Sequence, residues 1–183
     1  MGASPEMRVL ELGRYRRARV WIDEAPDAVY RPVEILSHKI PAEKALAVAK
    51  LAAVELFVPA GPRAQYGLLG GHLQPDATGE LIVEVGVSSS HERLFPDNLA
   101  LQEDEVRVGF PAEYTPAIVP GLELAKTQLG GLAAGKLSID CAAHASNVTV
   151  FKHLTATLVK LLHTASADTA DEELLKLFPE TLS

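Results

Sequence analysis

Several short stretches of the chain alternate hydrophobic and polar residues, which is the pattern of β-strands buried on one face. Three of them predict strands: 32–39 (PVEILSHK), 80–88 (ELIVEVGVS) and 105–110 (EVRVGF). A fourth strand is predicted over 18–22 (ARVWI), which is rich in β-branched and aromatic residues. The run 136–143 (KLSIDCAA) predicts a fifth strand that is largely buried. Proline, glycine and polar residues predict loops between these strands, over 23–31, 58–79 (with room for one short strand at 66–69) and 89–103.

Apolar residues at helical spacing predict helices elsewhere. The Ala-rich stretch 41–56 (PAEKALAVAKLAAVEL) predicts the first, because Pro41 suits a first helical turn and apolar residues recur every three to four positions from Leu46 to Leu56. A second helix is expected from Thr115-Pro116, a cap followed by a first-turn proline, to Leu129.

Two further helices are expected toward the C-terminus. The first is capped by Ser146 or Asn147 and ends near His163; we expect its apolar side to face the core, with Lys152, Thr155 and Lys160 facing water. After a polar spacer, a short last helix is built on an apolar stripe of Leu174, Leu175 and Phe178.

Strands in separate, hairpin-like runs favour an α+β architecture, a mixed sheet with helices on one face, over a strictly alternating parallel sheet. We expect residues 32–163 to form a single α+β core domain. Residues 1–31 are assigned to an N-terminal arm and first strand, and residues 164–183 to the C-terminal spacer and short helix.

The chain has 183 residues, enough for one well-cored domain. Its 17 basic and 24 acidic side chains give a net charge of −7, which opposes sequence-independent nucleic-acid binding because such binding depends on neutralising phosphates. No apolar run approaches the roughly 20 residues of a membrane span, and the N-terminus lacks the apolar core of a secretory signal. The single cysteine, Cys141, excludes an internal disulfide, so a cytoplasmic setting is predicted.

One dense basic run interrupts this acidic chain: Arg14, Arg16, Arg17 and Arg19. It has two interpretations. The run either contacts RNA or an acidic partner, or it is an exposed, solvated terminal segment, which is what such runs usually are.

Residues 130–138 (GGLAAGKLS) match the G-x-x-x-x-G-K spacing of a phosphate-binding loop. Such a loop needs a strand before the glycines and a helix after the lysine. Here a predicted helix runs into Gly130 and a predicted strand leaves from Lys136, and Leu137 stands where a metal-binding hydroxyl is required. We therefore expect Gly130 and Gly131 to end a helix, and no nucleotide site.

Residues 113–121 (EYTPAIVPG), the glycine turn, residues 137–140 (LSID), His144 and Phe151 together resemble domain IV of translation elongation factor G. The resemblance covers about residues 105–163, and Gln65-Tyr66-Gly67 is similar to a Q-Y-G strand of the same domain. It implies the ribosomal protein S5 domain 2-like fold, a small mixed sheet with two helices on one face and a βαβ unit of unusual hand.

That fold also occurs in small-metabolite kinases, topoisomerases and chaperones, so the resemblance selects no function. The chain has no basic, glycine-rich loop like the one at the tip of the family's domain. Together with the net charge, this departure argues against a translocase-like role on the ribosome.

No coherent catalytic or metal-binding set is visible. The six histidines form no H-x-x-x-H, and there is no C-x-x-C, so no metal site is predicted. Ser88-Ser89-Ser90-His91-Glu92 contains the residue types of an acyl-transfer triad, but triads assemble from separated elements, and we expect a turn. Cys141 lies in an apolar run without an activating neighbour and is expected to be a buried small hydrophobe.

Asp140 and His144, at the end of the last predicted strand, are the remaining catalytic candidates, with Ser146 and Asn147 nearby. A hydrogen-bonded Asp–His pair could tune the imidazole for acid–base chemistry. The alternative is a structural contact at the strand–helix junction.

The favoured hypothesis is a non-catalytic binding or assembly module that acts through protein contacts and needs no cofactor. The basic run 14–19 and the loop 89–103 are its candidate contact surfaces. A homo-oligomer is also expected, because the stripe of Leu174, Leu175 and Phe178 needs a cover in cis or in trans. Two alternatives stay open: an enzyme acting on a small metabolite or phosphorylated ligand near Asp140 and His144, and a ribosome- or RNA-associated accessory factor.

Overall fold

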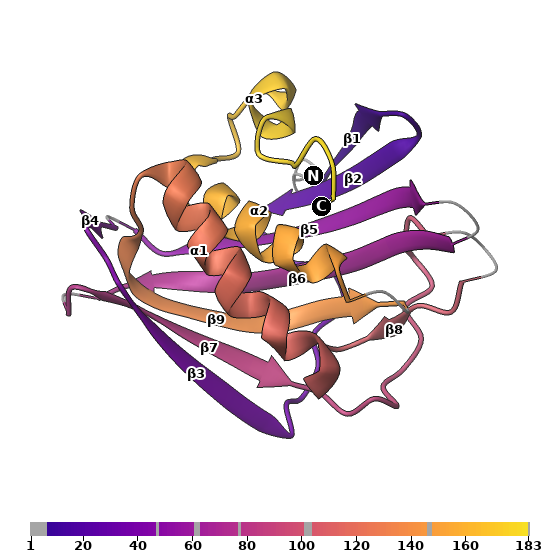
Figure 1. Cartoon of the computed structure of the whole chain (residues 1–183), viewed down its shortest axis with the longest axis horizontal. Coiled ribbons are helices and arrows are strands. Elements are labelled where there is room, and N and C mark those ends of the chain that lie inside the picture. Colours follow the sequence, from indigo (N-terminus) through magenta and orange to yellow (C-terminus); the bar gives the residue numbers. More distant parts are fainter. Residues whose placement is uncertain are drawn as a thin grey trace, which may run out of the picture.

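One mixed β-sheet with two long helices on one face makes up most of the molecule (Figure 1). The computed structural model describes residues 7–46, 48–60, 63–76, 78–100, 104–145 and 148–182. Its strands are β1 (Arg8–Gly13), β2 (Arg16–Ile22), β3 (Glu34–Pro41), β4 (Lys44–Ala45), β5 (Lys50–Ala60), β6 (Arg63–Pro75), β7 (Glu80–Val87), β8 (Arg107–Val108) and β9 (Ala133–His144). Its helices are the 3-10 helix η1 (Ala112–Ala117) and the α-helices α1 (Ile118–Leu129), α2 (Val150–Thr164) and α3 (Asp171–Leu175).

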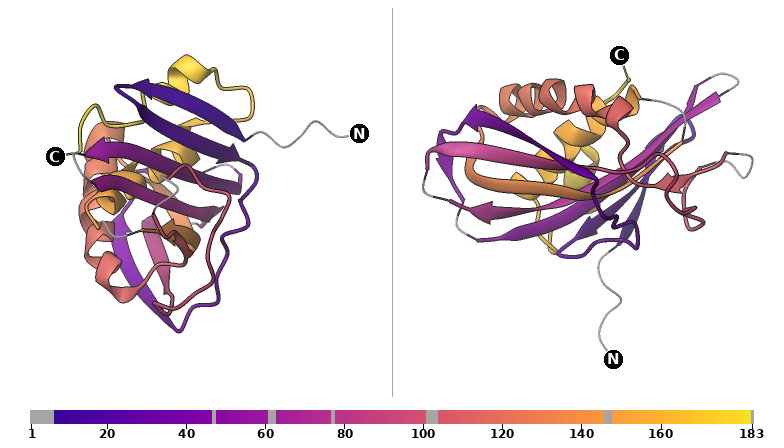
Figure 2. Two further views of the ribbon diagram at one scale, coloured as in Figure 1. Left: turned by 90° about the vertical axis from the view of Figure 1, so that its right-hand side faces the viewer. Right: turned by 90° about the horizontal axis from the view of Figure 1, so that it is seen from below.

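The sheet runs in the order β1-β2-β5-β6-β9-β7-β3, and the two-residue strands β4 and β8 pair with β9. Apart from the β4–β9 and β7–β9 pairs, which are parallel, the strand pairs are antiparallel. Both α1 and α2 lie on the same face of the sheet, as the two side views in Figure 2 show. The predicted α+β class, with a mixed sheet and helices on one face, is therefore confirmed.

The parallel strands β7 and β9 are neighbours joined through η1 and α1. In Figure 1 β7 lies below β9, both strands run to the right, and α1 crosses in front of the sheet, so this crossover is left-handed. About 98% of such connections are right-handed, which makes the hand of this one a distinctive feature of the topology.

The predicted helix over 41–56 is wrong, because these residues form the end of β3, the short β4 and the first half of β5. Strand β5 lies inside the sheet between β2 and β6, and residues 52–57 are all buried. A strand buried on both faces shows no alternation, and its alanines carry a helix propensity that the sheet pairing overrides.

The predicted loop over 58–79 is also wrong for most of its length, because β6 covers Arg63–Pro75 and pairs with both β5 and β9. Its glycines suggested a loop, but at Gly67 the strand passes directly under α2. A Cβ atom there would lie 2.6 Å from Leu154 Cδ1 and 3.0 Å from Phe151 Cζ. Glycine is therefore required by close packing rather than by a turn.

The glycine turn before β9 behaves as predicted. Gly130 and Gly131 have φ angles of 69° and 130°, and the N–H groups of both donate to the carbonyl oxygen of Lys126 at the end of α1. Lys136 lies inside β9, where its Nζ is 2.7 Å from Glu84 Oε1 of β7. The backbone thus runs helix–glycine–strand, which is not the geometry of a phosphate-binding loop.

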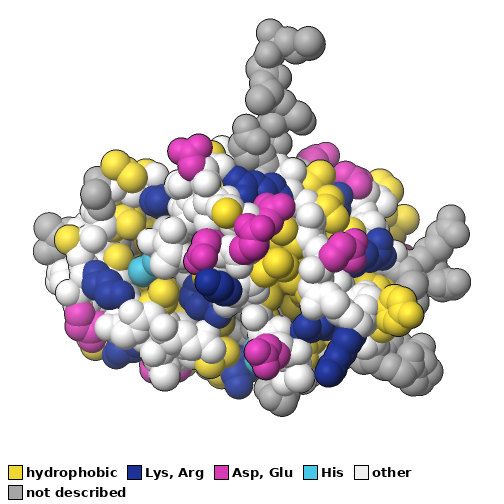
Figure 3. All heavy atoms as spheres, turned by 90° about the horizontal axis from the view of Figure 1, so that it is seen from above, with side chains coloured by type: hydrophobic (Ala, Val, Ile, Leu, Met, Phe, Trp, Pro, Cys, Tyr) yellow, Lys and Arg dark blue, Asp and Glu magenta, His cyan; other side chains and the backbone are white. Residues whose placement is uncertain are grey.

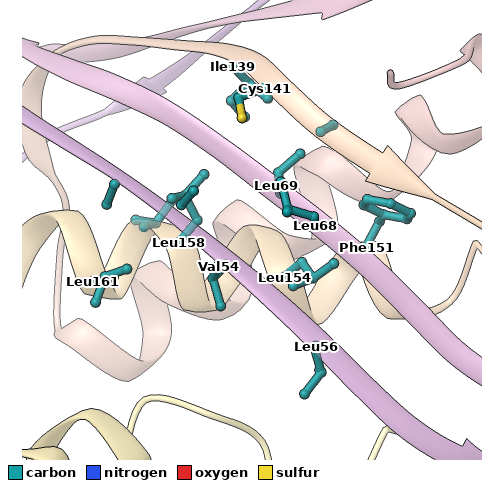
Figure 4. Packing of buried hydrophobic residues seen from close by; sticks show 14 of the residues in the cluster. Val54, Leu56, Leu68, Leu69, Ile139, Cys141, Phe151, Leu154, Leu158 and Leu161 are labelled. Atoms are coloured by element: carbon teal, nitrogen blue, oxygen red, sulfur yellow. The ribbon is translucent and has the colours of Figure 1, made fainter. Parts of the chain in front are cut away.

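The main core lies between the sheet and α2. Phe151, Leu154, Leu158 and Leu161 of α2 pack toward Val54, Leu56 and Leu69 of β5 and β6, and all are buried (Figure 4). In the described part of the chain no helix is both long enough and apolar enough to cross a membrane.

The C-terminal stripe that suggested an oligomer is covered in cis. Leu174 and Phe178 are buried within the chain, and Leu175 is half-buried. Arg8 of β1 donates to the carbonyl oxygens of Ala167 and Thr169, which fixes the segment 165–182 beside β1. The stripe therefore gives no reason to expect a second copy.

Candidate functional site

The structure does not bring Asp140 and His144 together. They lie four residues apart on the extended strand β9, roughly 13 Å at about 3.3 Å per residue, and no hydrogen bond or ion pair joins them. His144 is buried against the ring of Tyr114, whose centroid is 5.1 Å away. Its Nδ1 lies 3.1 Å from the carbonyl oxygen of Ala145, which also accepts the Tyr114 hydroxyl at 2.9 Å.

Burial lowers the pKa of His144, so the imidazole is held in its neutral form. Its contacts tie the end of β9 to η1, as the structural alternative for this junction requires. Ser146 and Asn147 lie outside the described residues.

The serine cluster after β7 forms a turn. Ser88 is buried; its hydroxyl donates to the carbonyl oxygen of Ser89 at 2.9 Å and accepts from the Phe110 amide at 2.8 Å. The Ser89 hydroxyl accepts from the His91 amide at 2.9 Å. Cys141 is buried as expected, and burial raises its pKa to about 12, so it stays a thiol.

Three of the four arginines in the basic run have partners within the chain. Arg16 donates to the carbonyl oxygens of Pro179 (2.9 Å) and Glu180 (2.7 Å), which holds the C-terminal segment in place. Arg17 lies over the ring of Phe57, 5.4 Å from its centroid. Arg14 lies in the β1–β2 turn with a φ angle of 54°. On the face viewed in Figure 3, Lys and Arg are interspersed with Asp, Glu and scattered hydrophobic patches, so no broad cationic surface forms there.

Arg19 belongs to a buried charge cluster on the sheet face opposite the helices. It pairs with Glu55, which is fully buried, and with Asp97 Oδ1 at 3.1 Å. Glu55 also accepts the hydroxyl of Tyr66 at 2.5 Å and the amide of Leu99 at 3.1 Å. This cluster fixes residues 97–99 of the loop 89–103 against the sheet; residues 101–103 lie outside the described part.

The candidate site that the geometry favours lies between α1, α2 and the C-terminal segment. There the structure has a cavity of about 560 Å³, which we call the α-groove; it is lined in part by Gln128, Lys152, His153, Lys160, Lys176 and Glu180. One wall of the α-groove is a single face of α2, which carries both His153 and Lys160 because they are seven residues apart. The C-terminal segment is held against that face by the Thr157 hydroxyl, which lies 3.2 Å from the Leu177 carbonyl oxygen.

Lys160 is the distinctive residue of the α-groove. Its side chain was expected to face water, yet the residue is only 9% exposed. Its Nζ donates to the neutral Gln128 Oε1 at 2.6 Å, and no carboxylate of the described residues pairs with it. Burial accordingly lowers its pKa.

The remaining charges in the α-groove are mostly positive. Lys152 is half-buried on α2, and Lys176 is exposed and paired with Glu173 at 3.1 Å. Glu180 is the one carboxylate among the lining residues. The α-groove therefore combines a buried, uncompensated cation with further basic side chains in a chain whose net charge is −7.

Comparison of the sequence with family models and with curated proteins, and of the fold with solved structures, returns no match.

Proposed function

We propose that the protein is a non-catalytic binding module that acts through protein contacts and holds an acidic segment of a partner protein in the α-groove. The observation that carries the proposal is Lys160, a buried cation without a countercharge at the wall of a cavity. A cytoplasmic setting remains the expectation from the sequence.

A buried charge without a countercharge is energetically unfavourable. Removing an ammonium group from water costs several kcal/mol unless an anion and hydrogen bonds replace the water. At Lys160 only the amide oxygen of Gln128 replaces the lost water, and the pKa of Lys160 is lowered because this environment is unfavourable for the charged amine. A carboxylate entering the α-groove would supply the missing charge, in a partly buried site where salt screens the attraction less than at the surface.

Size and neighbouring charge agree with this assignment. A cavity of about 560 Å³ lies within the roughly 300–1,000 Å³ of ordinary ligand pockets and can take one or two acidic side chains. Lys152 adds positive charge along the same wall, whereas Lys176 is already paired with Glu173.

The enzymatic alternative has less support than the binding module, because its candidate catalytic groups lie too far from one another. Within the described ranges, neither the serine–histidine turn nor the Asp140–His144 pair places a nucleophile or base within hydrogen-bond reach of its required partner. General acid–base and nucleophilic mechanisms depend on such contacts.

We also propose that residues 50–164 form a ribosomal protein S5 domain 2-like unit. The chain order β5, β6, β7, α1, β9, α2 and the left-handed β7–α1–β9 crossover support it, since two helices on one face and an unusual hand are what that fold requires. This fold assignment carries no activity with it.

The test of the α-groove is binding of a fluorescein-labelled octaglutamate peptide, measured by fluorescence anisotropy, with an octalysine peptide as the charge control. Lys160→Met keeps the aliphatic length and removes the charge; we expect it to weaken octaglutamate binding about tenfold, the equivalent of ~1.4 kcal/mol. The matched control is Arg14→Met, which removes an exposed cation of the β1–β2 turn, outside the α-groove, and should bind as the unmodified protein does.

A second readout follows the amine itself. In protein labelled with ¹³C at the lysine ε-carbon, the pKa of Lys160 should rise when octaglutamate binds, because a carboxylate favours the charged form. Equal affinity of the unmodified and Lys160→Met proteins, or equal binding of the two peptides, would refute the proposal.

A further inference from the structure

The two edges of the sheet differ in a way that bears on self-association. At one edge, β1 pairs with β2 through an irregular register, with a shift between Glu11 and Gly13. The segment 165–182 lies beside this strand, fixed by Arg8. A bulge and a covering segment are two of the means by which proteins protect an edge strand from pairing with another chain.

The opposite edge, β3, has neither protection. It pairs with β7 without a register shift, from Glu34 opposite Val87 to Pro41 opposite Glu80. Nothing in the described part of the chain lies beyond it, and it forms the lower border of the molecule in Figure 1. Its backbone therefore presents a regular row of unpaired N–H and C=O groups, which is a template for a further strand.

Exposed apolar side chains stand at this edge among the exposed polar residues Glu34, Ser37 and Lys39. Ile35 is 60% exposed and Val33, just before the strand, is 72% exposed. Proline, which blocks strand pairing, occurs in β3 only at its last position, Pro41. A partner strand would remove the apolar side chains from water and pair the backbone groups in the same step.

We propose that two copies of this chain associate through β3, pairing antiparallel about a two-fold axis perpendicular to the sheet. Glu34 and His38 are four residues apart, so they lie on the same face of β3. With the axis at Leu36, Glu34 faces His38 of the second copy; with the axis at Ser37, the two are diagonal neighbours. Antiparallel pairing thus puts each Glu34 carboxylate beside an imidazole and away from the other carboxylate, whereas parallel pairing in register would put the two carboxylates side by side.

This interface is closed, since a two-fold axis uses up both copies' edges. It also leaves the α-groove open, because the groove involves α1, α2 and the C-terminal segment, whereas β3 lies at the opposite border of the sheet (Figure 1). The dimer and the binding of an acidic segment are therefore independent proposals.

The experiment is analytical ultracentrifugation of the full chain over a concentration series. The unmodified protein should shift from monomer to dimer as its concentration rises, and Ile35→Lys should raise the dimer dissociation constant at least about tenfold. Val9→Lys is the matched control: Val9 is a 54% exposed residue of β1, the protected edge, so this change should leave the dimer intact. Glu34→Lys is a second variant, also at an exposed position, and should weaken the dimer because it removes the carboxylate that lies beside His38 in both copies.

Amide hydrogen exchange identifies the interface independently of mutation. Residues 34–41 should gain protection as the protein concentration rises, while the β1 amides should not. A monomer at every concentration up to the millimolar range overturns the proposal. A dimer that tolerates both Ile35→Lys and Glu34→Lys, or one whose protection appears on another strand, overturns it as well.

Discussion

Replacing Glu55 by glutamine should destabilise the protein more than any change at its surface. Glu55 is fully buried and accepts three donors: Arg19 Nε, the Tyr66 hydroxyl at 2.5 Å and the Leu99 amide at 3.1 Å. Glutamine is nearly isosteric, but it carries no charge, and its amide NH₂ must face one of these donors. The substitution therefore removes a countercharge and at least one hydrogen bond while leaving the volume unchanged.

The expected magnitude follows from what remains around Arg19. Its other carboxylate partner, Asp97, has a side chain that is 89% exposed and is a weak substitute for a buried anion. Breaking a buried ion pair by removing one partner costs about 3–5 kcal/mol. For a chain of this size, at about 2–4 °C per kcal/mol, the melting temperature should fall by roughly 6–20 °C.

Urea unfolding followed by tryptophan fluorescence is the direct assay. Trp21 is the single tryptophan and its ring lies 5.1 Å below the Arg19 guanidinium, so its emission reports on this cluster. Asp97→Asn is the matched control and should cost less than about 1 kcal/mol. A loss below about 1 kcal/mol for Glu55→Gln, or equal losses for the two variants, would show that the buried pair is not what stabilises this region.

Two further predictions concern helix packing and pH. Burial lowers the pKa of His163, whose Nε2 accepts the Ala133 amide at 2.9 Å. The neutral imidazole therefore contributes fully to the free energy of unfolding above pH ~6.5, the pKa in the unfolded chain, and this contribution is lost as the pH falls through the lowered pKa of the folded state. His163→Gln should therefore flatten the acid limb of urea-unfolding stability, whereas the exposed His91→Gln should not; parallel profiles would contradict this. Gly121→Ala should lower the melting temperature although alanine favours helix by about 1 kcal/mol, because the new Cβ would lie 2.5 Å from Thr155 Cβ; a higher melting temperature would show that α1 moves away at little cost.

Local pattern identified the elements that are half-buried or that carry a clear end signal. Strands β3 and β7 alternate because one face of each is more exposed than the other. Strand β2 is buried throughout 18–22 and was identified by its β-branched and aromatic residues instead. The predicted ranges of all three strands lie within two residues of the observed bounds at each end. Helix α1 ends where Gly130 adopts a left-handed conformation, as the glycine pair indicated. In these cases the environment of each residue repeats with the period of its own element, so the sequence contains the information.

Strands β5 and β6 lacked such a signal because both are enclosed by other elements. The alanines of β5 pack between neighbouring strands, and Gly67 of β6 makes room for Leu154 of α2, a residue far away in the chain. Propensity describes a residue among its sequence neighbours, whereas these choices depend on partners brought close only by the fold. The left-handed crossover has the same origin, since hand is a property of how elements pack.

For the candidate sites, too, some features could be predicted from the sequence and others depended on the tertiary structure. From the sequence alone, composition excluded a disulfide, spacing and chain order argued against a phosphate loop, and His144 could be placed at a strand end. The α-groove and the Glu55 cluster could be recognised only in the tertiary structure. In the sequence, Lys160 lies on a helix face that is expected to be exposed, but residues 177–178 cover that face in the fold. Arg19 belongs to a basic run in the sequence, but in the fold it pairs with Glu55. Burial sets the energy of a charge, and burial is decided by the segments that fold over it rather than by its neighbours in sequence.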